Sequence, residues 1–137
     1  MSNEITVNAT VDNLTQVIDF IDAQLESAGC SMKPQMQVDI AVEELFVNVA
    51  SYAYDGMEGE ITIRFDVDRK NNTAVITLID RGVPYDPLKK EDPDVSLSAE
   101  QRQIGGLGIF MVKKSMDSME YRYENKCNIV TLRKKMG

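Results

Sequence analysis

The chain has 137 residues, a length typical of one domain, with 43% hydrophobic and 27% charged residues. It contains no histidine and only two cysteines, which excludes a Ser-His-Asp triad, a histidine-ligated metal and a disulfide framework. The net charge is −7, although the stretch from Lys113 onward carries +4. An acidic chain disfavours a nucleic-acid partner. The sequence also shows no signal peptide and no membrane span, so we expect a cytoplasmic location.

The first part of the chain predicts one strand and two helices. Alternating apolar residues favour a short strand over 4–10, and helical spacing favours a helix from 12 or 13 to about 28. Pro34 can open a second helix that runs to about Tyr54. Because its apolar residues cover nearly every side, we expect this second helix to be buried between layers.

The rest of the chain predicts two hairpins separated by a loop and a helix. Residues 81–105 are rich in Pro, Asp, Lys and Ser, and a helix follows Gly108 to about 116 or 117. The expected strands cover 59–68, 73–80, 119–124 and 127–133, with an Asn125-Lys126 turn in the second hairpin. This order predicts a single α+β domain over 1–137, a two-layer sandwich with a mostly antiparallel mixed sheet covered by helices on one face.

Glu44 and Asn48 are the first pair of residues that could carry chemistry. They lie four residues apart on the second predicted helix, and therefore on one face, at the flank of its apolar stripe. A carboxylate and an amide oxygen in this position could hold a hard cation and an attacking nucleophile. The alternative is a solvated helix edge.

Two glycine-containing segments are the other candidates. Asp80 ends a predicted strand and Gly82 allows a sharp turn, so the carboxylate could accept a hydrogen bond from an exocyclic amine; the alternative is an ordinary turn. The run Gly105-Gly106-Leu107-Gly108 leads into the third predicted helix. Backbone N–H groups at a helix N-terminus can cradle phosphate, whereas the alternative is a flexible hinge.

The order of these three motifs resembles the ATP-binding domain of the GHKL (Bergerat-fold) superfamily. Two segments are similar in sequence to one branch of this superfamily, the anti-sigma factor serine kinases of bacterial partner switches. These segments are Ala41-Val42-Glu43-Glu44-Leu45-Phe46-Val47-Asn48 and Gly105-Gly106-Leu107-Gly108-Ile109-Phe110. The resemblance extends over essentially the whole chain.

The resemblance implies a role for each motif residue. Asp80 would hydrogen-bond the adenine amino group of ATP, Gly82 would let the base approach, and Asn48 would ligate Mg²⁺. Glu44 would be the general base that takes the proton from a serine of the protein substrate. The backbone N–H groups of four residues would bind the phosphates: Gly105, Gly106, Leu107 and Gly108.

The resemblance also implies a lid and shows two departures from the family. The ATP lid would cover about 86–104, with Arg102 as the candidate for the γ-phosphate and Lys89 and Lys90 as alternatives. Tyr52 stands where many members have a histidine. Cys127-Asn128 stands where the family usually has Gly-Thr, so Asn128 would take the place of the threonine near adenine.

Three functions remain in competition. The first is a serine-protein kinase whose partners are a STAS-type anti-sigma factor antagonist and a sigma factor or other regulatory client; small kinases of this branch are often dimers, so a homodimer is a further expectation. The second is a nucleotide-gated binding module without useful catalysis. The third, the ATP-binding half of a histidine kinase, is disfavoured because the chain lacks the phosphoacceptor histidine.

Overall fold

The computed structural model describes residues 3–54, 57–89 and 106–137, and these form two layers. One layer is a five-stranded sheet in the order β1-β2-β3-β5-β4. All four strand pairings are antiparallel, so the sheet is antiparallel throughout rather than mixed. The strands are β1 Asn3–Asn8, β2 Glu60–Asp68, β3 Thr73–Asp80, β4 Ser118–Glu124 and β5 Cys127–Lys135.

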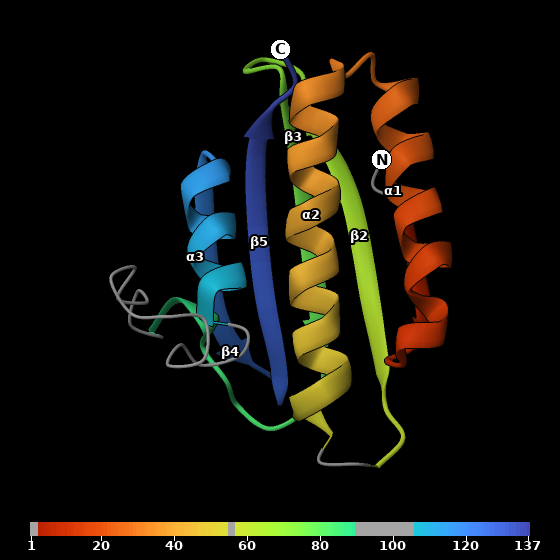
Figure 1. Cartoon of the computed structure of the whole chain (residues 1–137), viewed down its shortest axis with the longest axis vertical. Helices are drawn as coiled ribbons and strands as arrows, with labels where there is room; N and C mark the ends of the chain where they lie inside the picture. The colour runs from red at the N-terminus through yellow and green to blue at the C-terminus, as the bar shows by residue number, and fades with distance from the viewer. Residues whose placement is uncertain (1–2, 55–56, 90–105) are drawn as a thin grey trace.

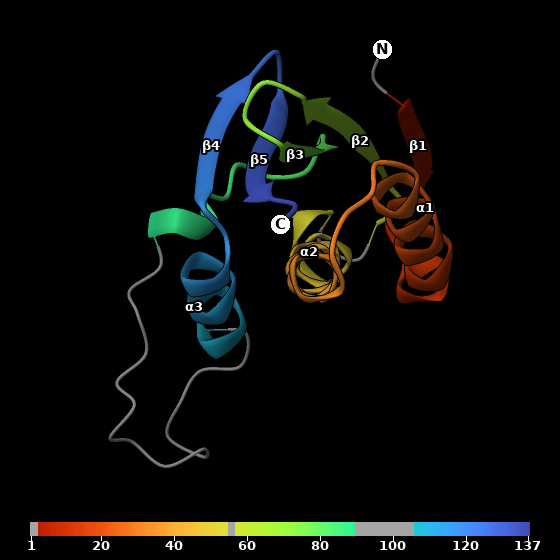
Figure 2. The same ribbon diagram turned by 90° about the horizontal axis from the view of Figure 1, so that it is seen from above.

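The other layer consists of α-helices on one face of the sheet (Figure 1). Figure 2 shows α1, α2 and α3 side by side, with α2 in the middle. The α-helices in the described residues are α1 Leu14–Ser27, α2 Met32–Asn48 and α3 Gly106–Ser115, accompanied by the 3-10 turns η1 Val11–Asn13 and η3 Pro87–Lys89. None of these helices is long and apolar enough to cross a membrane.

The helix after Pro34 has the predicted length but changes character at its end. The α-helical part of α2 stops at Asn48, and one π-helical turn, η2 (Val49–Ala53), continues the chain. Such π turns are rare and often occur at functional sites. The change places Asn48 at the junction of the two helical forms, directly before the turn that approaches the end of β3.

Only one side of α2 is buried, which corrects the expectation from sequence. Five residues of α2 are buried against the sheet and the neighbouring helices: Val38, Ala41, Val42, Leu45 and Phe46. Met32, Met36 and Ile40 are 78%, 58% and 52% exposed on the opposite side. All the described helices lie on the same face of the sheet, so no second layer covers the outer side of α2.

The β4–β5 hairpin turns where the sequence predicts. Asn125 and Lys126 both have positive φ angles, 53° and 66°. Two consecutive left-handed residues form the turn that matches the twist of a two-residue hairpin. The resulting register places Tyr123 opposite Asn128 and Tyr121 opposite Val130. It therefore determines which tyrosine can reach the end of β5.

Two carboxyl groups face each other where α1 and α2 meet. Asp22 Oδ1 and Asp39 Oδ1 are buried, and neither has a hydrogen-bond partner among the described residues. Burial, and then the neighbouring Asp22 and Glu26 carboxyl groups, raise the pKa of Asp39 to about 8. The folded chain thus keeps a proton on this pair at a pH where an ordinary carboxyl group has lost it.

We predict that this pair makes the protein less stable as the pH rises. The unfolded chain releases the Asp39 proton near about pH 4, and the folded chain near about 8. The unfolding free energy therefore falls across this interval, because the folded state binds more protons. Asp39→Asn should raise the unfolding free energy at pH 8 by about 1 kcal/mol, a modest value because the pair is partly exposed to solvent.

Thermal unfolding of both proteins at pH 5 and pH 8 checks this prediction. The gain from Asp39→Asn should be much smaller at pH 5, where the folded wild type is protonated and only about a quarter of the interval between the two pKa values has been crossed. Asp19→Asn, which changes an exposed aspartate of α1, is the control and should show no pH-dependent difference. An equal effect of Asp39→Asn at both pH values would contradict the account.

Candidate functional site

The helix α2 carries the first pair of candidate residues toward one end of the sheet. Glu44 and Asn48 lie one turn apart, and Asn48 is the last α-helical residue before η2. The Asn48 Nδ2 atom is buried and has no hydrogen-bond partner among the described residues. Because an amide can present its oxygen or its nitrogen after a half-turn about χ2, this side chain has an unused polar group for a ligand.

Asp80 is the buried carboxylate at the end of β3. It pairs in register with Ile61 of β2 and Asn128 of β5, so its side chain lies on the helix-covered face of the sheet. Its Oδ1 atom accepts hydrogen bonds from Gly82 N and Asn128 Nδ2, each 2.9 Å long. Burial raises the pKa of Asp80, whereas these two hydrogen bonds oppose the rise.

Gly82 allows the chain after β3 to touch η2. A Cβ atom on Gly82 would lie 2.3 Å from the Ala53 carbonyl oxygen and 2.4 Å from Ala53 Cβ. The close approach is completed by a 2.8 Å hydrogen bond from Val83 N to Ala53 O. The next residue, Tyr54, donates its hydroxyl to Glu60 O and accepts from Arg81 N at 2.9 Å. The end of α2 is thus joined to β2 and β3.

Gly108 allows a second close approach, between α2 and α3. A Cβ atom on Gly108 would lie 2.1 Å from Glu44 Oε2, so the Glu44 carboxylate rests against the first turn of α3. Gly106, Leu107 and Gly108 form that first turn. The N–H groups of a first helical turn have no partner within the helix and favour negative charge. Arg102, Gly105, Lys90 and most of the lid expected over 86–104 lie outside the described residues.

A small apolar pocket of about 40 Å³ lies between α2, η2 and β5. It is lined by Leu45, Asn48, Val49, Tyr52, Ala53, Leu78, Val83, Tyr85, Pro87, Asn128 and Val130. Ligand pockets commonly measure roughly 300–1,000 Å³, so a ring system could enter only if the rim opened. The rim residues Tyr52, Val83 and Tyr85 are exposed and have room to move outward.

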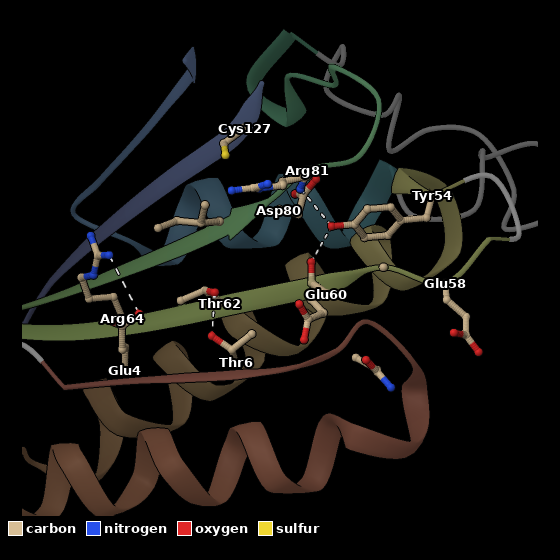
Figure 3. Close-up of a pocket in the computed structure, with 13 residues that line it drawn as sticks. Glu4, Thr6, Tyr54, Glu58, Glu60, Thr62, Arg64, Asp80, Arg81 and Cys127 are labelled. Carbon is tan, nitrogen blue, oxygen red and sulfur yellow. Dashed lines mark hydrogen bonds and ion pairs between the residues drawn. The ribbon is translucent and has the colours of Figure 1, made fainter. Parts of the chain in front are cut away.

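A larger hollow, about 740 Å³, is on the other face of the sheet. Figure 3 shows its lining, in which Glu4 pairs with Arg64 at 4.0 Å and the Thr6 and Thr62 hydroxyls are 2.8 Å apart. Asp80 reaches its rim, but the Asp80 carboxylate is held on the helix side by Asn128. Of the other residues that the sequence singled out, Cys127 also lines this hollow, whereas Asn48, Tyr52 and Asn128 line the smaller pocket, so we place the candidate site at the smaller pocket.

Three tyrosines connect the site and were missed in the sequence. Tyr54 joins η2 to β2 and β3, Tyr121 donates its hydroxyl to Asn128 Oδ1, and the backbone of Tyr85 donates to the same oxygen. In the sequence, Tyr121 and Tyr54 look like ordinary apolar positions, because hydroxyl partners follow from tertiary contacts. Tyr52, at the position where many relatives have histidine, lies at the pocket rim and is 57% exposed.

The end of α2, the end of β3 and the first turn of α3 are distant in sequence but lie together on one face of an antiparallel sheet. This arrangement is that of a GHKL-type ATP-binding domain. The sequence model of the histidine kinase-like ATPase domain matches residues 7–134, and the chain belongs to this family. The chain is similar to the serine-protein kinase RsbW of Listeria monocytogenes serovar 1/2a, with 31% identity over 75% of this chain and 68% of the relative. RsbW of Listeria innocua serovar 6a is 30% identical over the same shares.

Solved structures share the fold. One contains the RsbU and RsbW domains of Rv1364c from Mycobacterium tuberculosis, with a TM-score of 0.71, 15% identity, and coverage of 99% of this chain and 32% of that one. Another is the histidine kinase domain of the Erythrobacter litoralis EL346 blue-light activated histidine kinase, with a TM-score of 0.57, 14% identity, and coverage of 90% and 59%. The chain thus spans about a third of the first of these two proteins.

Replacing Gly82 or Gly108 by alanine adds a methyl group at a close contact, and we predict different effects on the unfolding free energy at the two positions. Gly82→Ala should lower the unfolding free energy by about 1–3 kcal/mol, because its Cβ meets the backbone of Ala53 and cannot be accommodated by a rotamer change. Gly108→Ala should leave stability unchanged or raise it by up to about 1 kcal/mol, because it meets only the end of the flexible Glu44 side chain and alanine favours a helix.

Denaturant unfolding of both variants checks this contrast. Arg81→Ala is a control for the first variant, since Arg81 is an exposed neighbour whose side chain makes no hydrogen bond or ion pair with a described residue. Equal losses of unfolding free energy for Gly82→Ala and Gly108→Ala would contradict the predicted difference between the contact of Gly82 with Ala53 and the contact of Gly108 with Glu44.

Proposed function

We propose that this chain is an ATP-dependent serine-protein kinase that phosphorylates a STAS-type anti-sigma factor antagonist and sequesters a sigma factor or other regulatory client in a partner switch. The similarity to RsbW serine-protein kinases supports the protein class. The observation that carries the proposal is the position of the Glu44 carboxylate against the first turn of α3. It puts a proton acceptor beside the N–H groups best suited to hold a phosphate chain.

The residues at the end of β3 fit an adenine base. Both hydrogen bonds to Asp80 use Oδ1, so Oδ2 is available to accept from an exocyclic amine. Gly82 has no side chain that could obstruct a base beside Asp80. The small pocket nearby is apolar, which suits the faces of a purine. The base would enter as Tyr52 and Tyr85 move outward.

The residues on α2 and α3 fit a phosphate chain with Mg²⁺. In nucleotide sites, Mg²⁺ usually takes one or two protein oxygens and several from the phosphates. The unpartnered amide of Asn48 can supply such an oxygen. The N–H groups of Gly106, Leu107 and Gly108 would hold the phosphates, together with Gly105 and Arg102 of the lid. When bound, Mg²⁺ would neutralise the charge that develops on the transferred phosphoryl group.

Glu44 would act on the serine of the protein substrate. Its carboxylate would accept the hydroxyl proton as the serine oxygen forms its bond to the γ-phosphorus and the bond from that phosphorus to the β–γ bridging oxygen breaks. ADP then leaves with the electron pair of the broken bond. Removing a general base of this kind lowers a rate by about 10²–10⁴-fold.

We predict that Glu44→Gln separates binding from transfer. With γ-labelled ATP, Mg²⁺ and a STAS-type antagonist protein from the same organism, the wild type should label a serine. Glu44→Gln should reduce this transfer by at least about 10²-fold while the thermal shift produced by ATP stays within about 1 °C of the wild-type shift. The expected separation arises because the amide keeps the shape and polarity of Glu44 but cannot accept the proton.

Glu43→Gln is the matched control, since Glu43 is the adjacent, exposed glutamate of α2. It should leave both binding and transfer unchanged. ATP binding by the wild type without any transfer would contradict the kinase proposal and favour a nucleotide-gated binding module. No thermal shift at millimolar ATP would contradict the nucleotide site itself.

A further inference from the structure

The side chain of Asn128 uses all of its hydrogen-bonding capacity within the protein. Its Nδ2 donates to Asp80 Oδ1 and Val83 O, each at 2.9 Å. Its Oδ1 accepts from Tyr85 N at 3.1 Å and from the Tyr121 hydroxyl. An asparagine amide has two donor hydrogens and two acceptor lone pairs, and this one is 3% exposed. No polar position of Asn128 remains for direct contact with a nucleotide.

The orientation of this amide is determined by its partners. The Tyr85 N–H can only donate, so it must face the amide oxygen. The Val83 carbonyl can only accept, so it must face the amide nitrogen. The Asp80 carboxylate, on the nitrogen side, satisfies the same arrangement. A rotated amide would place two acceptors against its oxygen and a backbone donor against its nitrogen.

Asn128 therefore connects three parts of the site. It holds the end of β3 through Asp80, the segment 82–85 through Val83 and Tyr85, and the edge strand β4 through Tyr121. The bond from Asn128 and the bond from Gly82 N both end on Asp80 Oδ1. They restrict the rotation of the carboxylate and leave Oδ2 without a hydrogen bond to a described residue, so Oδ2 is the oxygen free to accept from a ligand.

The same hydrogen bonds act on the charge of Asp80. Burial raises the pKa of this carboxyl, and the donors Asn128 and Gly82 lower it. Both donors therefore favour the ionised form, which has acceptor oxygens only. When it is ionised, a carboxylate held in this way accepts a hydrogen bond from a ring amine, whereas a ring carbonyl oxygen would place two acceptors against each other.

We propose that Asn128 is a positioning residue that sets nucleobase specificity, orienting Asp80 for a 6-amino purine and against a 6-oxo purine without itself touching the nucleotide. This inference rests on the proposed nucleotide site. It replaces the direct contact with adenine expected for Asn128 from its place in the sequence. Tyr121 helps to orient Asn128, since its hydroxyl donates a hydrogen bond to the Asn128 amide oxygen.

The test compares the affinities of ATP and inosine triphosphate, which differ at position 6 by an amine and a carbonyl. The wild type should prefer ATP. Asn128→Ala should lower the ATP to inosine triphosphate affinity ratio by about tenfold, the equivalent of one well-placed hydrogen bond. The fall should come from weaker ATP binding, because an Asp80 that can rotate no longer holds an acceptor toward the amine, and from tighter inosine triphosphate binding, because it no longer rejects the carbonyl.

Tyr121→Phe is the milder variant and keeps the test valid if Asn128→Ala does not fold. It should reduce the ratio by about threefold. Tyr123→Phe is its control, since Tyr123 lies on the same strand, is 46% exposed and makes no hydrogen bond with a described residue; its ratio should equal that of the wild type.

A lower melting temperature with an unchanged ratio would show a merely structural role and overturn the inference. Equal weakening of both nucleotides by Asn128→Ala would also overturn it. If the wild type binds ATP and prefers it, a failure in the variants concerns Asn128 alone. If the wild type binds neither nucleotide, the proposed function fails and this inference fails with it.

Discussion

The closeness of α2 to its neighbours is the constraint on which the site depends. At Gly82 the chain after β3 touches the backbone of η2, with no room for a Cβ atom, and at Gly108 the first turn of α3 touches Glu44, so that a Cβ atom would fit only if the Glu44 side chain moved. Both contacts occur near the end of α2 that carries Glu44 and Asn48. The carboxylate proposed to recognise the base, the amide proposed to hold Mg²⁺, the proposed proton acceptor and the helix terminus proposed to bind phosphate are thereby brought around one helix, although they come from segments far apart in the chain.

Two aspartates, the buried Asp80 and the half-buried Asp39, show how the surroundings decide what a carboxyl group can do. Asp80 has two donors on one oxygen, which oppose the effect of burial on its pKa. Asp39 faces Asp22 and Glu26 instead, and its pKa rises to about 8. The first has one oxygen held by two donors, as our proposal of a hydrogen-bond acceptor for the base requires. The second keeps a proton and costs stability at neutral and basic pH, and nothing in its surroundings indicates a ligand.

Local sequence signals predict much of this fold because they act over a few residues. Strand alternation, helical spacing and the Asn125-Lys126 turn each reflect backbone preferences, and the observed elements agree with them to within a few residues. The exposed side of α2 was predicted wrongly, because apolar periodicity cannot show whether a second layer is present to cover Met36 and Ile40. The π turn at Val49–Ala53 also has no local sequence signal.

The site was predictable as a set of motifs, but its internal connections were not. The spacing of Glu44 and Asn48 and the glycines at 82 and 108 are visible in the sequence. By contrast, the bonds among Asn128, Tyr121 and Tyr85 depend on the β4–β5 register and on the path of the segment after β3. Because of these connections, all the polar atoms of Asn128, which we expected to contact the nucleotide, are hydrogen-bonded within the protein.

Amide hydrogen exchange with and without ATP and Mg²⁺ tests most directly whether the motifs form one nucleotide site on the helix side of the sheet. Bound nucleotide should slow exchange at Gly82 to Tyr85 and at Gly106 to Gly108. It should leave Thr6 and Thr62, which line the larger hollow on the other face, unchanged. Protection at Thr6 and Thr62 without protection at the two glycine segments would contradict the account.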